Sequence, residues 1–239
     1  MRQQALLKLP VTPTTRGRKS AKVKNQPAQS LRDAAYEAIK LRIITLAFKP
    51  GEYVNELQLS EMLGIGRTPV HQAIDRLMLE GQVEVIPRKG IIVKPLSVSE
   101  ILEITETRLL NECYCLRRLV DRISDTDLVA LGEIIKEAKA CSKRRDIEQL
   151  ILLDREFHLR LARLQGNEIF EDLLRNLIER SLRFWFISLN APSHVQSVQD
   201  EHDAILAALK KRDPQAAERA MRRHIESFRM TLMHYLQHG

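Results

Sequence analysis

Four residues in the C-terminal part of the sequence have side chains that commonly bind metal ions. Asp154 and His158 are four residues apart, so on a helix both project from the same face. His202 and His224 fall in two later helical segments, and in an antiparallel bundle their imidazoles can converge with the first pair. Three imidazoles and one carboxylate suit zinc, nickel, iron or manganese better than calcium or magnesium. On an octahedral ion these four ligands would leave positions for a chelating organic acid.

The pattern alone leaves a second interpretation open. Histidines on three separate helices are more often unrelated side chains, each with its own partners, than ligands of one ion. The remaining histidines, His194, His234 and His238, follow no such spacing and are expected at the surface or near the terminus.

A second group of polar residues lies at the start of a helix near the N-terminus. An arginine suits bidentate contact with guanine and a glutamine suits adenine, while the free N–H groups of a first helical turn suit a phosphate. A basic tip at Arg88, Lys89 and Gly90 follows, where glycine allows close approach to DNA. Each residue taken alone more often belongs to a solvated polar face, and it is the combination that favours DNA reading. The helix residues expected to reach DNA are Arg67, Thr68, His71, Gln72 and Arg76.

These DNA-facing residues require a particular set of elements to position them. Apolar spacing predicts helices over residues 30–46, 56–63 and 67–80, and a hairpin over residues 83–94. Only three residues, Gly64 to Gly66, separate the second and third helices. Two helices joined by a short glycine-containing turn, followed by a hairpin, predict a winged helix-turn-helix over residues 30–95.

Residues 96–239 show helical patterns and no strand pattern. Breaks at residues 124–125, 166–167, 191–192 and 213–214 predict helices joined by short loops, which implies an antiparallel six-helix bundle. The fold class is therefore expected to be mainly α. The predicted helices are 98–122, 125–144, 146–165, 167–190, 195–211 and 214–237.

Composition limits the class of protein. The net charge is +7, and residues 1–29 account for all of it, because they hold seven basic residues and no acidic one. This segment is expected to be a disordered basic arm: a processing remnant, a solubilising tail, or an arm along DNA phosphates. No uncharged stretch reaches 18 residues, so no membrane span is expected. The N-terminal segment has no apolar core behind its basic residues, so we do not expect it to act as a secretory signal. The three cysteines then suggest reduced thiols in the cytoplasm.

The segment from Tyr36 to Pro95 closely resembles the DNA-binding domain of the GntR superfamily. Its most specific feature is Arg67-Thr68-Pro69-Val70 followed by Ala73. The sequence departs from the family at Gly66, where a serine is usual, and at His71-Gln72, where Arg-Glu is usual. These departures imply an altered or weaker operator preference. Further matches are Leu46, Pro50-Gly51, Asn55-Glu56, Leu59, Leu63-Gly64, Ile74, Arg76-Leu77, Glu80-Gly81 and Arg88-Lys89-Gly90.

Residues 97–235 resemble the FCD ligand domain of the FadR subfamily, and six helices instead of seven favour its VanR-like branch. The resemblance implies that Asp154, His158, His202 and His224 hold a divalent transition metal. It also implies that Arg108 binds the carboxylate of an effector, although Arg108 could instead pair only with Glu112 or with a surface acid. The resemblance further implies a homodimer that binds an inverted repeat in double-stranded DNA.

The sequence thus predicts a ligand-responsive transcription regulator, expected to be a repressor that a small organic acid releases from DNA, and not an enzyme. Two alternatives remain. One is an architectural DNA-binding dimer without an effector. The other is a metal-dependent hydrolase with a DNA-binding appendage, which the absence of an evident separate general base disfavours.

Overall fold

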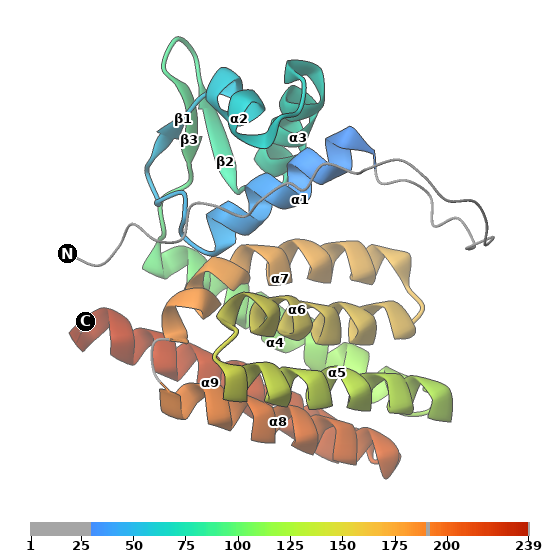
Figure 1. The fold of residues 1–239 in the computed structure, drawn as a ribbon. Coiled ribbons are helices and arrows are strands. Elements are labelled where there is room, and N and C mark those ends of the chain that lie inside the picture. The colour runs from blue at the N-terminus through green and yellow to red at the C-terminus, as the bar shows by residue number, and fades with distance from the viewer. Residues whose placement is uncertain (1–29, 190–191, 239) are drawn as a thin grey trace. The chain divides into compact units, whose positions relative to one another are not determined.

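The computed structural model describes residues 30–189 and 192–238, except for the side chains of residues 192–194 and 236–238. The predicted arm over residues 1–29 lies outside the described residues. The described part of the chain forms a small N-terminal domain with three strands and a C-terminal domain built from helices α4 to α9 (Figure 1).

The N-terminal domain has the predicted winged helix-turn-helix order. The Asn55 side chain accepts a hydrogen bond of 2.9 Å from the Gln58 amide and so starts the second helix, which Gly64 ends with a φ of 64°. The first helix ends two residues earlier than expected, before Leu46 adopts a φ of 57°. The elements are α1 (Leu31–Ile44), β1 (Tyr53–Val54), α2 (Glu56–Leu63), α3 (Arg67–Leu79), β2 (Val83–Ile86) and β3 (Gly90–Val93).

The strands form one antiparallel sheet in the order β1-β3-β2. Tyr53 pairs with Ile92, and Val83 pairs with Val93, which confirms the predicted hairpin and adds β1 to its free side. Gly90 has a φ of 105°, and a Cβ atom there would lie 3.2 Å from the Val54 carbonyl oxygen. The need for glycine at this position is therefore explained by the packing of β3 against β1.

The core of the N-terminal domain joins α1, α3 and the sheet. Ile39, Ile74 and Leu77 are buried together with Val83 and Val93. Leu31, the first residue of α1, lies outside this core, and its side chain is 62% exposed. Because Ile74 and Leu77 of α3 are buried in this core, the opposite face of α3 stays in solvent.

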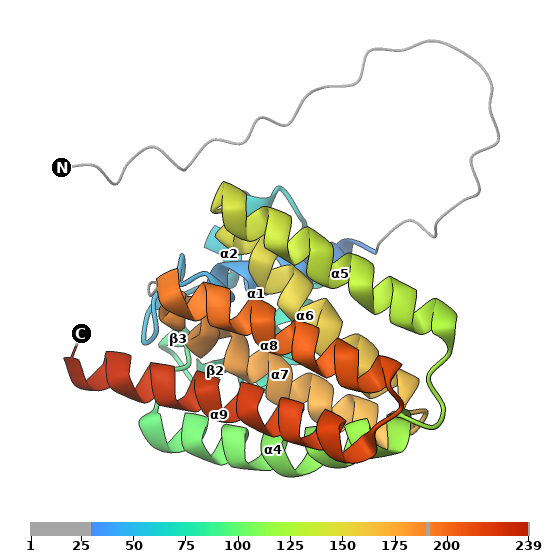
Figure 2. The ribbon, with the colours of Figure 1, turned by 90° about the horizontal axis from the view of Figure 1, so that it is seen from below.

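The C-terminal domain contains the six predicted helices. Contacts connect them in a closed cycle in the order α4, α9, α8, α5, α6, α7 and back to α4 (Figure 2). Serine or asparagine side chains cap several helix starts, including a capping box at Ser124. No described helix is both long and apolar enough to span a bilayer. The bounds are α4 (Val98–Leu119), α5 (Asp125–Arg144), α6 (Ile147–Leu164), α7 (Glu168–Ser188), α8 (Pro192–Lys210) and α9 (Pro214–His238).

Helix α1 lies against α7, so the two domains share a packed boundary (Figure 1). Ile44 of α1 is 2% exposed and belongs to the hydrophobic cluster of the C-terminal domain. Polar contacts reinforce the boundary, because Gln82 Nε2 donates to the Glu179 carbonyl at 3.1 Å and Arg183 Nη1 donates to the Lys94 carbonyl at 2.7 Å.

Candidate metal centre and DNA-reading surface

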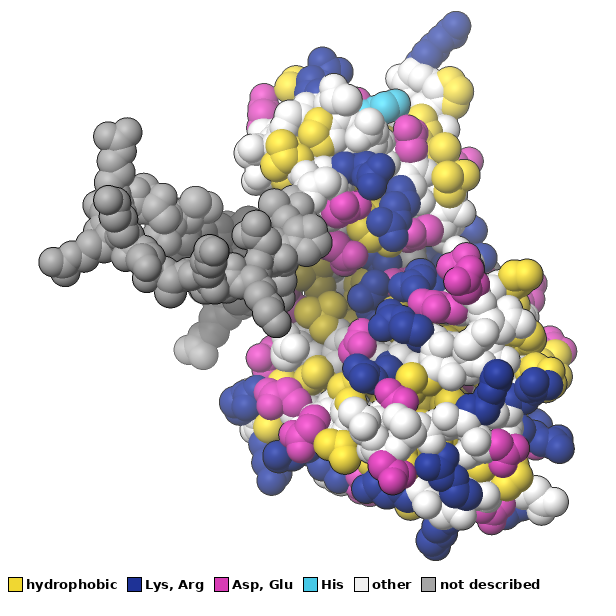
Figure 3. Space-filling view, turned by 90° about the vertical axis from the view of Figure 1, so that its right-hand side faces the viewer, with side chains coloured by type: hydrophobic (Ala, Val, Ile, Leu, Met, Phe, Trp, Pro, Cys, Tyr) yellow, Lys and Arg dark blue, Asp and Glu magenta, His cyan; other side chains and the backbone are white. Residues whose placement is uncertain are grey.

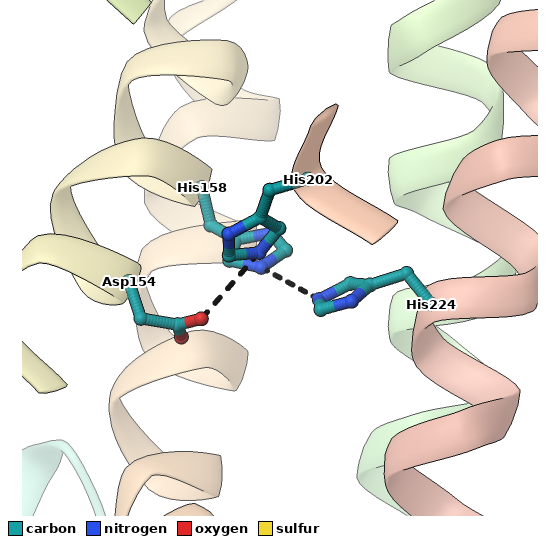
Figure 4. Close-up of side chains that lie close together, drawn as sticks. All are labelled: Asp154, His158, His202 and His224. Carbon is teal, nitrogen blue, oxygen red and sulfur yellow. Dashed lines mark hydrogen bonds and ion pairs between the residues drawn. The ribbon is translucent and has the colours of Figure 1, made fainter. Parts of the chain in front are cut away.

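Asp154, His158, His202 and His224 meet inside the helical domain (Figure 4). Asp154 and His158 project from α6, His202 from α8 and His224 from α9. All four side chains are buried, and one ligand atom from each lies within 4.8 Å of the others. Since metal bonds of about 2.0–2.2 Å place opposite ligands about 4 Å apart, this spacing is close to that of ligands around one ion.

Two carboxylates orient two of the imidazoles. His158 Nδ1 lies 2.8 Å from Glu112 Oε2, and His224 Nδ1 lies 2.9 Å from Glu201 Oε2. Burial alone would raise the pKa of both glutamates, but Arg108 and His158 lower that of Glu112, and His224 lowers that of Glu201. Ionised carboxylates only accept hydrogen bonds, so both Nδ1 atoms carry the hydrogen. This carboxylate–histidine arrangement is usual behind metal-binding imidazoles.

The remaining ring nitrogens consequently present lone pairs to each other. His158 Nε2 and His224 Nε2 are 3.1 Å apart, and neither can donate if its Nδ1 carries the only hydrogen of a neutral ring. His202 Nε2 and Asp154 Oδ1 lie 3.5 Å apart, and neither atom has a hydrogen-bond partner among the described residues. A cation at this point would satisfy all four atoms, so the donor set fits a divalent transition metal.

Burial sets the charge state of the other two candidate ligands. Desolvation raises the pKa of Asp154 to about 6, although His224 and Arg108 oppose that rise. Desolvation also lowers the pKa of His202 well below its usual value, with the neighbouring His224 acting in the same direction. A neutral His202 is the form that binds a metal. The ring of Phe157 packs against that of His202, with 4.4 Å between the ring centroids, and helps to fix it.

Arg108 of α4 is buried beside this cluster. Its Nε donates to Glu112 Oε1 at 2.6 Å, and its Nη1 donates to Ser181 Oγ of α7 at 3.0 Å. The pairing with Glu112 that the sequence suggested is therefore present. Because the other Glu112 oxygen bonds His158, one carboxylate connects Arg108 to a candidate metal ligand.

The predicted DNA-facing residues of α3 lie on its solvent face. Arg67, Thr68, His71 and Gln72 are exposed at the start of the helix, as are Arg88 and Lys89 at the hairpin tip. Gly66 is the N-cap and offers no side chain to cap the first turn, where the usual serine of the family would. The first-turn N–H groups are thus left for another acceptor.

His71 and Arg76 already have protein partners. His71 Nδ1 lies 2.7 Å from Glu56 Oε1 and its Nε2 lies 3.5 Å from Asp75 Oδ2, and these carboxylates raise its pKa, Glu56 first. The Arg76 guanidinium stacks 3.6 Å above the Tyr36 ring, and its Nε donates to Glu80 at 3.1 Å. Arg76 therefore has a structural role toward α1, and its contact with DNA stays a prediction.

Sequence reasoning missed the orienting roles of Glu112 and Glu201. Glu112 was noted only as a partner for Arg108, since its approach to His158 depends on how α4 packs beside α6. Glu201 precedes His202 in the sequence but serves His224 on the next helix. The one available signal was the presence of acidic residues on helices that neighbour a candidate ligand. Residue spacing within a single helix does not show which acidic residue faces which histidine.

Comparison with known proteins assigns both domains. Residues 31–93 match the family described as bacterial regulatory proteins, gntR family, and residues 103–227, more than half of the chain, match the FCD domain. The chain is 25% identical over 200 residues to the HTH-type transcriptional repressor RspR of Escherichia coli K12, covering 84% of this chain and 88% of that protein. A regulator from the TAR-I ttuE-ttuC' intergenic region of Agrobacterium vitis is 38% identical over 128 residues, covering 52% and 75%.

A solved structure shows the same fold. The structure of E. coli McbR/YncC superposes with a TM-score of 0.76 at 23% identity, covering 87% of this chain and 98% of that one. The winged helix-turn-helix, the helical domain and both family matches lead to one conclusion. The chain belongs to the GntR family of bacterial regulatory proteins, carries an FCD domain, and is a ligand-responsive DNA-binding transcription regulator.

Proposed function

We propose that the chain is a repressor whose affinity for DNA falls when a small organic acid binds at a metal held by Asp154, His158, His202 and His224. The observation that carries this proposal is the set of facing, partly unsatisfied ligand atoms in a buried site. A divalent transition metal there would supply a Lewis-acidic centre with positions for a chelating carboxylate. The chain's own residues then determine which acid fits.

Arg108 would bind the far carboxylate or hydroxyl of that acid. Its guanidinium has five N–H donors, and Glu112 and Ser181 account for two of its nitrogen atoms. Because both partners hold the planar group rigidly, little side-chain entropy is lost when an acid binds. The proposed ligand is therefore anionic and small, with one end at the metal and the other at Arg108.

The start of α3 would enter the major groove, where Arg67, Thr68, His71 and Gln72 contact bases or phosphates. Arg88 and Lys89 would reach the neighbouring minor groove or the DNA backbone. Gly90, which has no side chain, would let the protein backbone approach the DNA closely. Exposure of these side chains on one domain supports this docking. An inverted repeat would then require two copies of the chain.

We propose that the second copy packs on an apolar patch of α4 and α7. This patch consists of Leu110, Tyr114, Ile169 and Leu173, all exposed, with Leu110 at 67% and Ile169 at 81%. Tyr114 of α4 stacks on Phe170 of α7 with 5.5 Å between the ring centroids, which brings the two helices into contact at this patch. A patch of this kind on a protein that reads a two-fold symmetric site favours a second copy as its occupant.

The hydrolase alternative has less support. The carboxylates nearest the cluster, Glu112 and Glu201, are both engaged by imidazole nitrogens, so neither is free to act as a general base on a water molecule. The architectural alternative does not explain why the Nε2 atoms of two buried histidines, His158 and His224, face each other. Both alternatives predict that organic acids leave DNA affinity unchanged.

The direct experiment recovers the operator by selecting genomic fragments with the purified protein. DNA affinity is then measured with Zn²⁺ or with EDTA, against a panel of small di- and tricarboxylic acids. The proposal predicts that at least one acid weakens binding only in the metal-loaded protein. If no acid changes the affinity although the protein holds metal, the repressor proposal is wrong.

A further inference from the structure

Glu179 of α7 connects the two domains through one buried carboxylate. Its side chain is only 2% exposed, yet it contacts two cations from different elements. Oε2 lies 2.6 Å from Lys40 Nζ of α1, and Oε1 accepts from Arg155 Nε of α6 at 2.8 Å. The N-terminal domain and the helix that carries Asp154 and His158 thus share a single anion.

On the DNA-reading side, hydrogen bonds continue from Lys40 to the end of α3. Lys40 Nζ donates to Tyr36 Oη at 2.6 Å, and Tyr36 Oη in turn contacts the Glu80 carboxylate at 2.8 Å. Glu80 is the C-cap residue of α3 and also accepts from Arg76 of that helix. A displacement of Glu179 would therefore shift, through these contacts, the C-terminal end of the helix that carries Arg67.

On the sensor side, the same short part of α7 contacts the candidate ligand site. Ser181, two residues after Glu179, accepts a hydrogen bond from Arg108. Arg155 directly follows Asp154 in α6. The backbone of Glu179 is also fixed, because its carbonyl accepts from Gln82 Nε2 at the end of the turn after α3.

Burial makes this ion cluster sensitive to small displacements. Desolvation lowers the pKa of Lys40 and Glu179 opposes that shift, whereas Lys40 and Arg155 lower the pKa of Glu179 against its own desolvation. A buried charge that loses its partner is strongly destabilising, so the groups must move together or not at all. The surface, by contrast, carries solvated charges, and on the face in Figure 3 the Lys and Arg side chains are interspersed with Asp and Glu.

We propose that Glu179 is a positioning residue that transmits the state of the ligand site to the DNA-reading helix α3. A ligand that shifts α6 or the Ser181 turn of α7 moves the Glu179 carboxylate. Lys40, Tyr36 and Glu80 follow it, and the tilt of α3 changes relative to the helical domain. This inference rests on the proposed ligand site, because it names the path by which that site acts on DNA binding.

Hydrogen exchange measured by mass spectrometry on the full chain tests the path without knowledge of the operator. Exchange is compared with Zn²⁺ and with EDTA. In the wild type we expect Zn²⁺ to slow exchange in α6, α8 and α9, where the ligands lie, and to change exchange in α1 and α3. In Glu179→Gln, the change in α6, α8 and α9 persists while the change in α1 and α3 is lost.

Glu171→Gln is the matched control. Glu171 lies on the same helix and also pairs with an arginine of α6, Arg163. Unlike Glu179, it has no ion pair with Lys40 of the N-terminal domain. This variant is expected to keep the response in α1 and α3. If Glu179→Gln does not fold, the double variant Lys40→Met with Glu179→Gln removes both buried charges, and Arg155, which is 21% exposed, can turn to solvent. The same loss is expected.

Two results would overturn the inference while leaving the ligand site intact. One is a Zn²⁺ response in α1 and α3 that survives Glu179→Gln or the double variant. The other is a wild type in which α6, α8 and α9 respond but α1 and α3 do not. A wild type with no response in α6, α8 and α9 would instead contradict the proposed metal site itself, and the path would fail with it.

Discussion

The Nε2 atoms of His158 and His224 face each other at 3.1 Å inside the helical domain, while a carboxylate holds the Nδ1 atom of each ring. Two lone pairs at this separation repel each other unless a cation or an additional proton lies between them. This relationship gives the candidate metal centre a physical basis that is independent of family likeness.

The first prediction concerns the metal itself. The purified protein should hold about one divalent transition metal per chain, measured by inductively coupled plasma mass spectrometry. His202→Ala should lose it, because one of four buried ligand atoms disappears. His234→Ala, which alters an exposed histidine of α9, should retain the metal. Equal metal content in both variants would argue against the assigned ligands.

The second prediction concerns the orientation of His158. Glu112→Gln removes the carboxylate that fixes the His158 tautomer and also neutralises the partner of Arg108. Loss of such an outer partner typically lowers metal affinity about 10- to 100-fold. Competition with a chelating dye measures this change. The control Glu106→Gln changes an exposed glutamate of the same helix and should leave the affinity unaltered; an equal loss there would mean a general effect of charge.

The third prediction concerns DNA recognition by α3. Arg67→Ala should weaken specific binding about 5- to 150-fold, since a bidentate arginine contact contributes about 1–3 kcal/mol of discrimination and this residue leads the helix. Lys89→Ala should weaken binding to all sequences about equally and reduce its salt dependence. Fluorescence anisotropy on operator and scrambled duplexes separates the two. Unchanged operator affinity in Arg67→Ala would contradict the docking.

The fourth prediction is a pH dependence through His71. Glu56 and then Asp75 raise its pKa, so the imidazole is protonated over more of the range near neutrality. The positive form favours phosphate contact, and its charge is present below the raised pKa and lost as pH rises through it. Operator affinity should therefore fall between about pH 6 and pH 8. His71→Gln should flatten this profile, and an equally steep profile in that variant would assign the effect to another group.

The fifth prediction concerns the dimer. Ile169→Asp places a charge within the apolar patch on α4 and α7 and should convert the proposed dimer to a monomer, as measured by analytical ultracentrifugation. Val129→Asp is the matched control, because Val129 is 66% exposed on α5 outside that patch. Dissociation caused by both variants, or by neither, would place the interface elsewhere.

Local signals explain why so much of the fold was predictable. Asn55, Gly64, Ser124 and Asn167 start or end helices through contacts within a few residues, so spacing and residue type suffice to locate those ends. The errors occur where local signals are weak. Helix α8 begins at Pro192 instead of residue 195, since proline fits the first turn of a helix.

The candidate site was predictable in part. Asp154 and His158 share one helix face, and family likeness supplied His202 and His224. Glu112 and Glu201 could not be assigned because their roles depend on the lateral packing of different helices. The burial of Lys40 and Glu179 could not be predicted for another reason. Charged residues are rarely fully buried, so a sequence alone assigns them to the surface.

The central claim is that the buried cluster in the helical domain controls DNA binding by α3. The most direct measurement is operator affinity of the metal-loaded protein with and without the acid found in the panel, compared with His202→Ala. We predict that the acid changes operator affinity by at least about five-fold in the wild type and does not change it in the variant. The same acid response in wild type and His202→Ala would contradict it.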